Sequence, residues 1–172
     1  MKFIDENSLN RLNFKELLSR VDIFSAYGKN KLNNVQNFLV GEEEKLEEEF
    51  ERMQKILDFI SVNKKEEMEI EIILHRLKDI KKLVENTKAN IILDTVDLFE
   101  IKTQLMAMAD LNSCLKKNKE VFSNFILKDL DELFKILDPN NEKIATFYIY
   151  ESYSMILKEI RRQKKEVENR LF

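Results

Sequence analysis

Residues 143–172 read KIATFYIYESYSMILKEIRRQKKEVENRLF, an aromatic segment that leads directly into a long charged sequence. The β-forming residues near 144–150 favour a short extended segment, and the charged part predicts a helix from about Glu151 onward. Along that helix, one stripe repeats with a period of about 3.5 residues, which is typical of a helix packed lengthwise on another. The stripe consists of Tyr153, Leu157, Ile160, Lys164, Val167 and Leu171.

The last residues of this helix predict how the chain continues and where Lys164 lies. No Gly, Asn or Pro follows the stripe, so we expect the helix to continue and the chain to be a piece of a longer protein. Lys164 is the one polar residue on the stripe, and we expect it to lie where the helix leaves the bundle rather than fully buried.

The composition of the whole chain favours helices. Of its 172 residues, 35% are charged, whereas only 2 are Gly and 1 is Pro. A strand-rich fold needs turn residues about every eight to twelve positions, and the chain lacks them. We therefore predict an all-α fold, a bundle of six to seven helices in one domain over residues 1–172, with a short extended segment near 144–150. The net charge of −3 argues against a chain whose main task is to bind phosphates.

Apolar periodicity and turn residues predict where the helices lie. Gly28, Gly41, Asn118 and the sequence DPNN at 138–141 indicate turns, and Asp94 is a good helix N-cap. The expected helices cover residues 14–24, 29–37, 42–61, 65–88, 95–117, 121–137 and 151–172, with a turn at 62–64.

Residues that carry catalysis or bind metals are scarce. Two isolated glycines cannot form a phosphate-binding loop. The chain has one histidine, His75, and one cysteine, Cys114, whereas a zinc site needs a cluster of such residues. His75 is expected at the surface or its boundary, and Cys114 as a small buried or boundary residue. We therefore predict no catalytic, metal-binding or cofactor-binding residue.

The last helix contains a basic cluster, interleaved with glutamates. The alternation predicts ion pairs within the helix, which cancel most of the positive field. A weak contact with the DNA backbone is one interpretation of the cluster, and a helical interaction or scaffold domain is the other. The candidates for the DNA contact are Arg161, Arg162 and Lys165.

The sequence also bears on location. Its N-terminus has no apolar core of signal-peptide length, and no apolar run approaches the roughly 20 residues that a membrane-spanning helix needs. A single cysteine cannot form a disulfide within the chain. We therefore expect a soluble protein of the reducing cytoplasm, with no membrane partner.

The order of the segments carries a family resemblance. The succession starts at Leu9 with LNRLNFKELLSRV, AYGKNKL and FLVGEEEKLEEEFERMQKILDFI, and it continues with ILHRLKDIKKLV, LFEIKTQLMAMADL and FYIYESYSMILKEIRRQKKEVENRL. This succession resembles the lever (core) domain, or domain III, of MutS-family proteins. The last segment is similar to the family's extended strand that leads into the descending lever helix. The family's Ser, Leu and Ile-Arg pair fall here on Ser154, Leu157, Ile160 and Arg161.

The resemblance implies a structural role. A lever with long antiparallel helices couples the DNA clamp of a MutS-like protein to its ATPase head. The chain would be truncated before the clamp and ATPase domains, and it would come from the branch that lacks the mismatch-reading domain. Its parent would be a homodimeric, DNA-dependent ATPase of DNA mismatch repair or recombination control, with ATP and Mg as cofactors and DNA as partner. A stand-alone helical scaffold or protein-interaction domain is the alternative.

Overall fold

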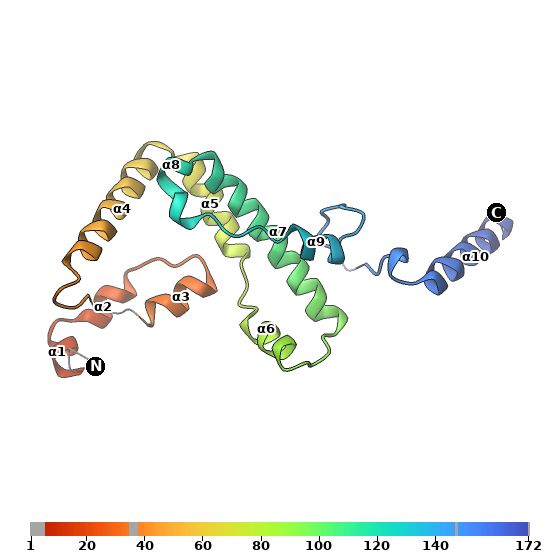
Figure 1. The fold of residues 1–172 in the computed structure, drawn as a ribbon, viewed down its shortest axis with the longest axis horizontal. Helices are drawn as coiled ribbons and strands as arrows, with labels where there is room; N and C mark the ends of the chain where they lie inside the picture. Colours follow the sequence, from red (N-terminus) through yellow and green to blue (C-terminus); the bar gives the residue numbers. More distant parts are fainter. Residues whose placement is uncertain (1–5, 35–37, 147, 172) are drawn as a thin grey trace. The chain divides into compact units, whose positions relative to one another are not determined.

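The computed structural model describes residues 6–34, 38–146 and 148–171, and every regular element in these ranges is a helix (Figure 1). The predicted all-α helical bundle is confirmed to that extent. The chain forms two compact units: unit 1 comprises residues 1–79 and 107–128, and unit 2 comprises residues 80–106 and 129–172. The long helix α7, Thr95–Lys117, contributes residues to both units. The single domain over 1–172 and the antiparallel lever helices stay predictions.

Unit 1 has its core where two long helices meet the second half of α7. Its helices are α1 (Glu6–Arg11), α2 (Phe14–Ser19), α3 (Ala26–Leu32), α4 (Glu43–Val62), α5 (Lys64–Arg76), α8 (Lys119–Phe122) and the 3-10 helix η1 (Ser123–Phe125). The rings of Phe59 and Phe122 pack edge to face with centroids 5.2 Å apart, which joins α4 to α8. The buried core residues are Ile73, Leu111, Cys114, Leu115 and Phe122.

The start of α4 follows from acidic residues and one glycine. Gly41 has a φ of 92°, in the region that favours glycine. Its N–H donates to the Glu43 side chain at 3.1 Å, and the Leu39 N–H donates to the Glu42 side chain at 3.0 Å. Hydrogen bonds from Lys45 and the Leu39 N–H lower the pKa of Glu42, and the Gly41 N–H lowers the pKa of Glu43. Glu42 and Glu43 therefore keep their negative charges at the positive end of the helix dipole, which stabilises the start of α4. This start lies one residue from the predicted one, residue 42.

The first two expected helices differ from the prediction at their ends. The expected helix 14–24 ends as α2 at Ser19, and the expected helix 29–37 is α3, which begins earlier, at Ala26. The reason is the Ser25 hydroxyl, which caps α3 by accepting from the Gly28 N–H at 3.0 Å. Gly28 therefore lies inside a helix instead of ending one. Positions 35–37 of that expected helix are outside the described residues.

The expected helix 65–88 is interrupted. Helix α5 ends at Arg76, and α6 (Lys81–Lys88) begins four residues after Leu77. Leu77 is extended, with ψ at 117°, and packs against the core of unit 1. Beyond it, the Asp79 side chain accepts a hydrogen bond from the Asn30 amide at 3.1 Å. This contact with a distant segment competes with local helical geometry, and a helical period cannot reveal it.

The expected helix 121–137 is also interrupted, at a hydrogen-bonded clamp. The side-chain amide of Asn112 accepts from the Leu127 N–H at 2.9 Å and donates to the Leu127 carbonyl at 3.1 Å. Both backbone groups of Leu127 are therefore used outside a helix. Residues 126–130 have no regular structure, and the helix resumes as α9, Asp131–Leu137.

Unit 2 consists of α6, the first half of α7, α9, the 3-10 helix η2 (Glu151–Tyr153) and α10 (Met155–Leu171). Helix α7 covers the predicted range 95–117, and the Asp94 carboxylate caps it by accepting from the N–H groups of Val96 and Asp97, each at 2.8 Å. The described residues of the expected extended segment near 144–150 form neither a helix nor a strand. Phe147 is outside the described residues.

Candidate functional site

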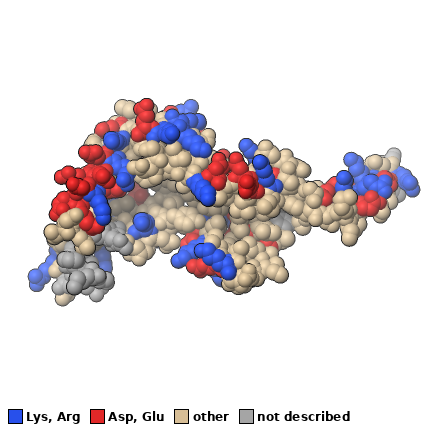
Figure 2. All heavy atoms as spheres, viewed as in Figure 1, with Lys and Arg blue, Asp and Glu red and all other residues tan. Residues whose placement is uncertain are grey.

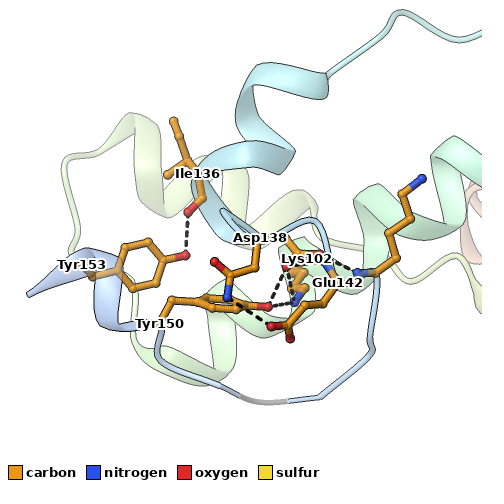
Figure 3. A network of polar contacts seen from close by, with 8 residues as sticks. Lys102, Ile136, Asp138, Glu142, Tyr150 and Tyr153 are labelled. Atoms are coloured by element: carbon orange, nitrogen blue, oxygen red, sulfur yellow. Dashed lines mark hydrogen bonds and ion pairs between the residues drawn. The ribbon is translucent and has the colours of Figure 1, made fainter. Parts of the chain in front are cut away.

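Three buried side chains of unit 2 form a polar network (Figure 3). Lys102 comes from α7, Asp138 follows α9, and Tyr150 precedes η2. The Lys102 ammonium donates to the Tyr150 hydroxyl at 3.0 Å, and that hydroxyl donates to Asp138 Oδ1 at 2.6 Å. Lys102 Nζ also lies 3.6 Å from Asp138 Oδ1. Asp138 is 1% exposed and Tyr150 is 2% exposed, so the network is closed to solvent.

The network also fixes the chain between α9 and α10. The Asp138 carboxylate accepts from the N–H groups of Glu142 at 3.2 Å and Lys143 at 2.8 Å. The Tyr153 hydroxyl donates to the Ile136 carbonyl at 2.6 Å. Figure 3 shows these contacts converging from α7, from the end of α9 and from the segment before α10. The base of α10 is therefore attached to α9 and α7.

The pKa shifts in the network follow from burial and hydrogen bonding. Burial acts to raise the pKa of Asp138, but hydrogen bonds from Tyr150 and from the N–H groups of Lys143 and Glu142, together with Lys102, outweigh it and lower this pKa. Burial and the adjacent Asp138 carboxylate raise the pKa of Tyr150. Asp138 is therefore an anion at neutral pH, whereas Tyr150 is a neutral phenol that donates its proton to it.

This arrangement suits structural support better than proton transfer. The Tyr150 hydroxyl is engaged by the Lys102 ammonium and the Asp138 carboxylate, and burial raises its pKa, which makes it a poor proton donor to a substrate at neutral pH. No buried side-chain nitrogen or oxygen in the described part of the chain lacks a hydrogen-bond partner. Lys102, Asp138 and Tyr150 therefore hold three segments together.

An apolar pocket of about 310 Å³ adjoins the network within unit 2. Lys102 and the rings of Tyr148 and Tyr153 contribute to its wall, and the other lining residues are mostly apolar. The remaining residues of the wall are Thr95, Leu98, Phe99, Ile136, Leu137, Thr146 and Ile149. The Lys102 ammonium is directed to Tyr150 and Asp138, so the pocket offers apolar contact and few free polar groups.

Arg161, the first candidate for a DNA contact, contacts aromatic and acidic neighbours. Its guanidinium donates to the Tyr148 hydroxyl at 2.8 Å and lies 4.7 Å from the centroid of that ring. It also lies 3.8 Å from the Glu151 carboxylate. Arg161 is therefore half-buried against the chain that precedes α10, which orients the first turns of this helix.

Arg162, the second candidate, is paired within α10. Its guanidinium donates to Glu159 at 2.7 and 2.9 Å and also to Glu166. Hydrogen bonds from Arg162 and Gln163 lower the pKa of Glu159 to about 2. The positive charge of Arg162 is therefore compensated by two glutamates, as the alternation of charges predicts.

Lys165, the third candidate, is exposed and makes no hydrogen bond or ion pair with the residues that the structure describes. The three candidates follow one another along α10, but their charged groups have different surroundings. Only Lys165 presents a free positive charge. The contact of these residues with the DNA backbone stays a prediction.

His75 and Cys114, the histidine and the cysteine of the chain, have the exposure and the burial that the sequence predicts. His75 is exposed, with its ring edge to face against Phe24 at 5.4 Å. Cys114 is buried in the core of unit 1, where burial and a contact with Glu69 raise the pKa of its thiol. Lys164 has an exposed side chain and is therefore not fully buried, and its expected place where the helix leaves the bundle stays a prediction. Within the described ranges, no group of three or more His, Cys, Asp or Glu side chains could hold a metal ion.

Sequence reasoning missed the network. One signal was present: Lys102 lies four residues after Leu98 and three before Leu105, on the apolar side of α7. A lysine in that place is rarely buried unless it is paired. Its partners could not be identified, because Tyr150 is 48 residues away in the sequence.

The comparisons add no relative: no family model, curated protein or solved structure matches this chain. Across the described residues, no helix combines the length and the apolar content that crossing a membrane requires.

Proposed function

We propose that the chain is the lever domain of a MutS-like DNA-binding ATPase. In this role it couples a DNA clamp to an ATPase head during DNA mismatch repair or recombination control, and it has no catalysis of its own. ATP and Mg would bind elsewhere in the parent protein, which would act on DNA as a homodimer. The proposal rests on the resemblance in the order of segments, and one structural observation supports it.

That observation is the continuity of α7. Its 23 residues form one unbroken helix, about 35 Å long at the usual rise per residue. Lys102, in its first half, belongs to the polar network of unit 2, and Leu111 and Leu115, in its second half, belong to the core of unit 1. A helix fixed in two separate sets of contacts can pass a displacement from one to the other, which a lever requires.

The gene gives the first test. Its reading frame should encode clamp-like helices and a phosphate-binding loop after codon 172. If the frame holds neither, the chain is not a lever of this family.

The parent protein gives a second test. The exposed Ala109, in the second half of α7, can be changed to proline, which breaks the helix, or to glutamine, which does not. We expect Ala109→Pro to abolish the stimulation of ATP hydrolysis by DNA and to leave the basal rate unchanged. Ala109→Gln should retain the stimulation. Equal stimulation in both variants would contradict a lever that acts through α7.

A stand-alone helical scaffold or protein-interaction domain is the second candidate. It is favoured by the apolar side chains that α10 exposes, among them Met155 at 80% and Ile156 at 73%. Exposed apolar side chains that lie together on a helix are typical of surfaces that bind another protein. A gene that encodes these 172 residues as an independent protein would favour this candidate over the lever.

A further inference from the structure

Helices α4 and α10 expose apolar rows that are bordered by opposite charges. On α4, Phe50, Met53 and Leu57 are 56%, 44% and 55% exposed. On α10, Ile160 and Val167 are 57% and 56% exposed. In both helices the spacing of three, four or seven residues places the row on one face, as in helices that pair lengthwise.

The border of the α4 row is acidic. Glu47, Glu51 and Asp58 follow the same side of the row, and α4 as a whole has seven acidic and three basic residues, a net charge of −4. Glu47 and Glu51 are exposed and have no cationic partner among the described residues. Figure 2 shows the acidic atoms gathered over α4.

The border of the α10 row is basic. Lys158 and Lys165 follow one side of it. Arg161 on that side is half-buried against Tyr148, and Glu168 on that side lies 3.6 Å from the ammonium of Lys164, which is within the row. Helix α10 has six basic and three acidic residues, a net charge of +3. Two of these acids, Glu159 and Glu166, are engaged by Arg162 on the opposite face. Figure 2 shows basic atoms prominent on this helix.

We propose that two copies of this chain associate by placing α10 of each copy on α4 of the other. The apolar rows then cover each other, and the basic border of α10 meets the acidic border of α4. This inference is independent of the proposed function, since it uses only the exposed apolar rows and the net charges of the two helices.

Electrostatics selects this pairing over the two homotypic ones. Two α4 helices would place acidic borders together, and two α10 helices would bring Lys164 and its basic border against their equivalents. Like charges across a helix pair are repulsive, and opposite charges select the partner.

The test is complementation between two charge-reversed variants of the full chain. Glu47→Lys/Glu51→Lys reverses the border of α4, and Lys158→Glu/Lys165→Glu reverses the border of α10. We expect the wild type to sediment as a dimer at low ionic strength and to dissociate as salt is added. Each variant alone should sediment as a 20.6 kDa monomer. Their equimolar mixture should form a dimer, because wild-type borders then meet wild-type borders and reversed borders meet reversed ones.

The control is Glu48→Lys, which reverses a charge of α4 on the face away from the row; this variant should stay dimeric. Far-UV circular dichroism verifies the helix content of each chain. If a reversed variant loses helix, the corresponding glutamine variants replace it and should weaken the dimer at least tenfold. A monomeric wild type, a dimeric reversed variant, or a mixture that stays monomeric would overturn the inference. The last result would also be expected if α4 and α10 paired within one chain.

Discussion

At the residue scale, Asp138 couples the stability of unit 2 to pH. Its pKa in the folded chain lies below its ordinary value of 3.8, so the unfolded chain binds more protons in acid. The stabilisation by Asp138 is therefore complete above the ordinary pKa and is lost as the pH falls through the folded pKa. We expect the free energy of unfolding, measured with urea, to decrease between about pH 5 and pH 3.

A substitution separates this residue from the other carboxylates. Asp138→Asn leaves the buried Lys102 without its anion, and removing one partner of a buried pair costs about 3 kcal/mol or more. The variant should therefore have a lower free energy of unfolding at pH 7 and a weaker dependence on acid. Glu132→Gln, at an exposed position of α9, serves as control and should retain the dependence. Parallel acid profiles for Asp138→Asn and the wild type would contradict the role of Asp138.

Asn112 makes a second prediction at this scale. Asn112→Ala removes both hydrogen bonds to the backbone of Leu127 and leaves a part-buried N–H and carbonyl without partners. This loss should lower the free energy of unfolding by about 1–3 kcal/mol. Ser113→Ala, at the exposed neighbouring position, should change it little. Urea unfolding of the two variants at pH 7 measures the difference, and equal stabilities would show that the clamp contributes nothing.

At the scale of elements, the N-cap of α7 can be tested with a close pair of variants. Asp94 accepts two backbone hydrogen bonds from the first turn. Asp94→Ala removes them and should lower the free energy of unfolding by about 1 kcal/mol. Asp94→Asn retains a side-chain oxygen that caps well, so its effect should be smaller. The same loss in both variants would indicate that charge, rather than the cap, is what matters.

This helix also shows what the sequence can predict. Helix α7 was predicted with its bounds because each determinant is local: Asp94 caps it, an apolar period runs along it, and Asn118 follows it. The expected helix 121–137 was wrong for the opposite reason. Its interruption depends on Asn112, which lies 15 residues from Leu127. The candidate site is nonlocal as well, since Lys102 meets partners that are distant in the sequence, whereas the pairing of Arg162 with its neighbours was predictable from helical spacing.

At the scale of the whole molecule, α7 decides whether the two units unfold together. Each unit takes part of its packing from this helix, Leu105 in unit 2 and Leu111 in unit 1. Unfolding one unit would remove the support of half of α7, and helix formation is cooperative along its length.

We expect backbone amides of α5 and of α7 near Lys102 to exchange hydrogen with the same free energy of opening in the wild type. In Ala109→Pro, which breaks the helix between the two sets of contacts, these free energies should diverge. Hydrogen exchange followed by mass spectrometry measures both, with Ala109→Gln as the control that retains a single value. Different values in the wild type would mean that the units open independently and that α7 does not couple them.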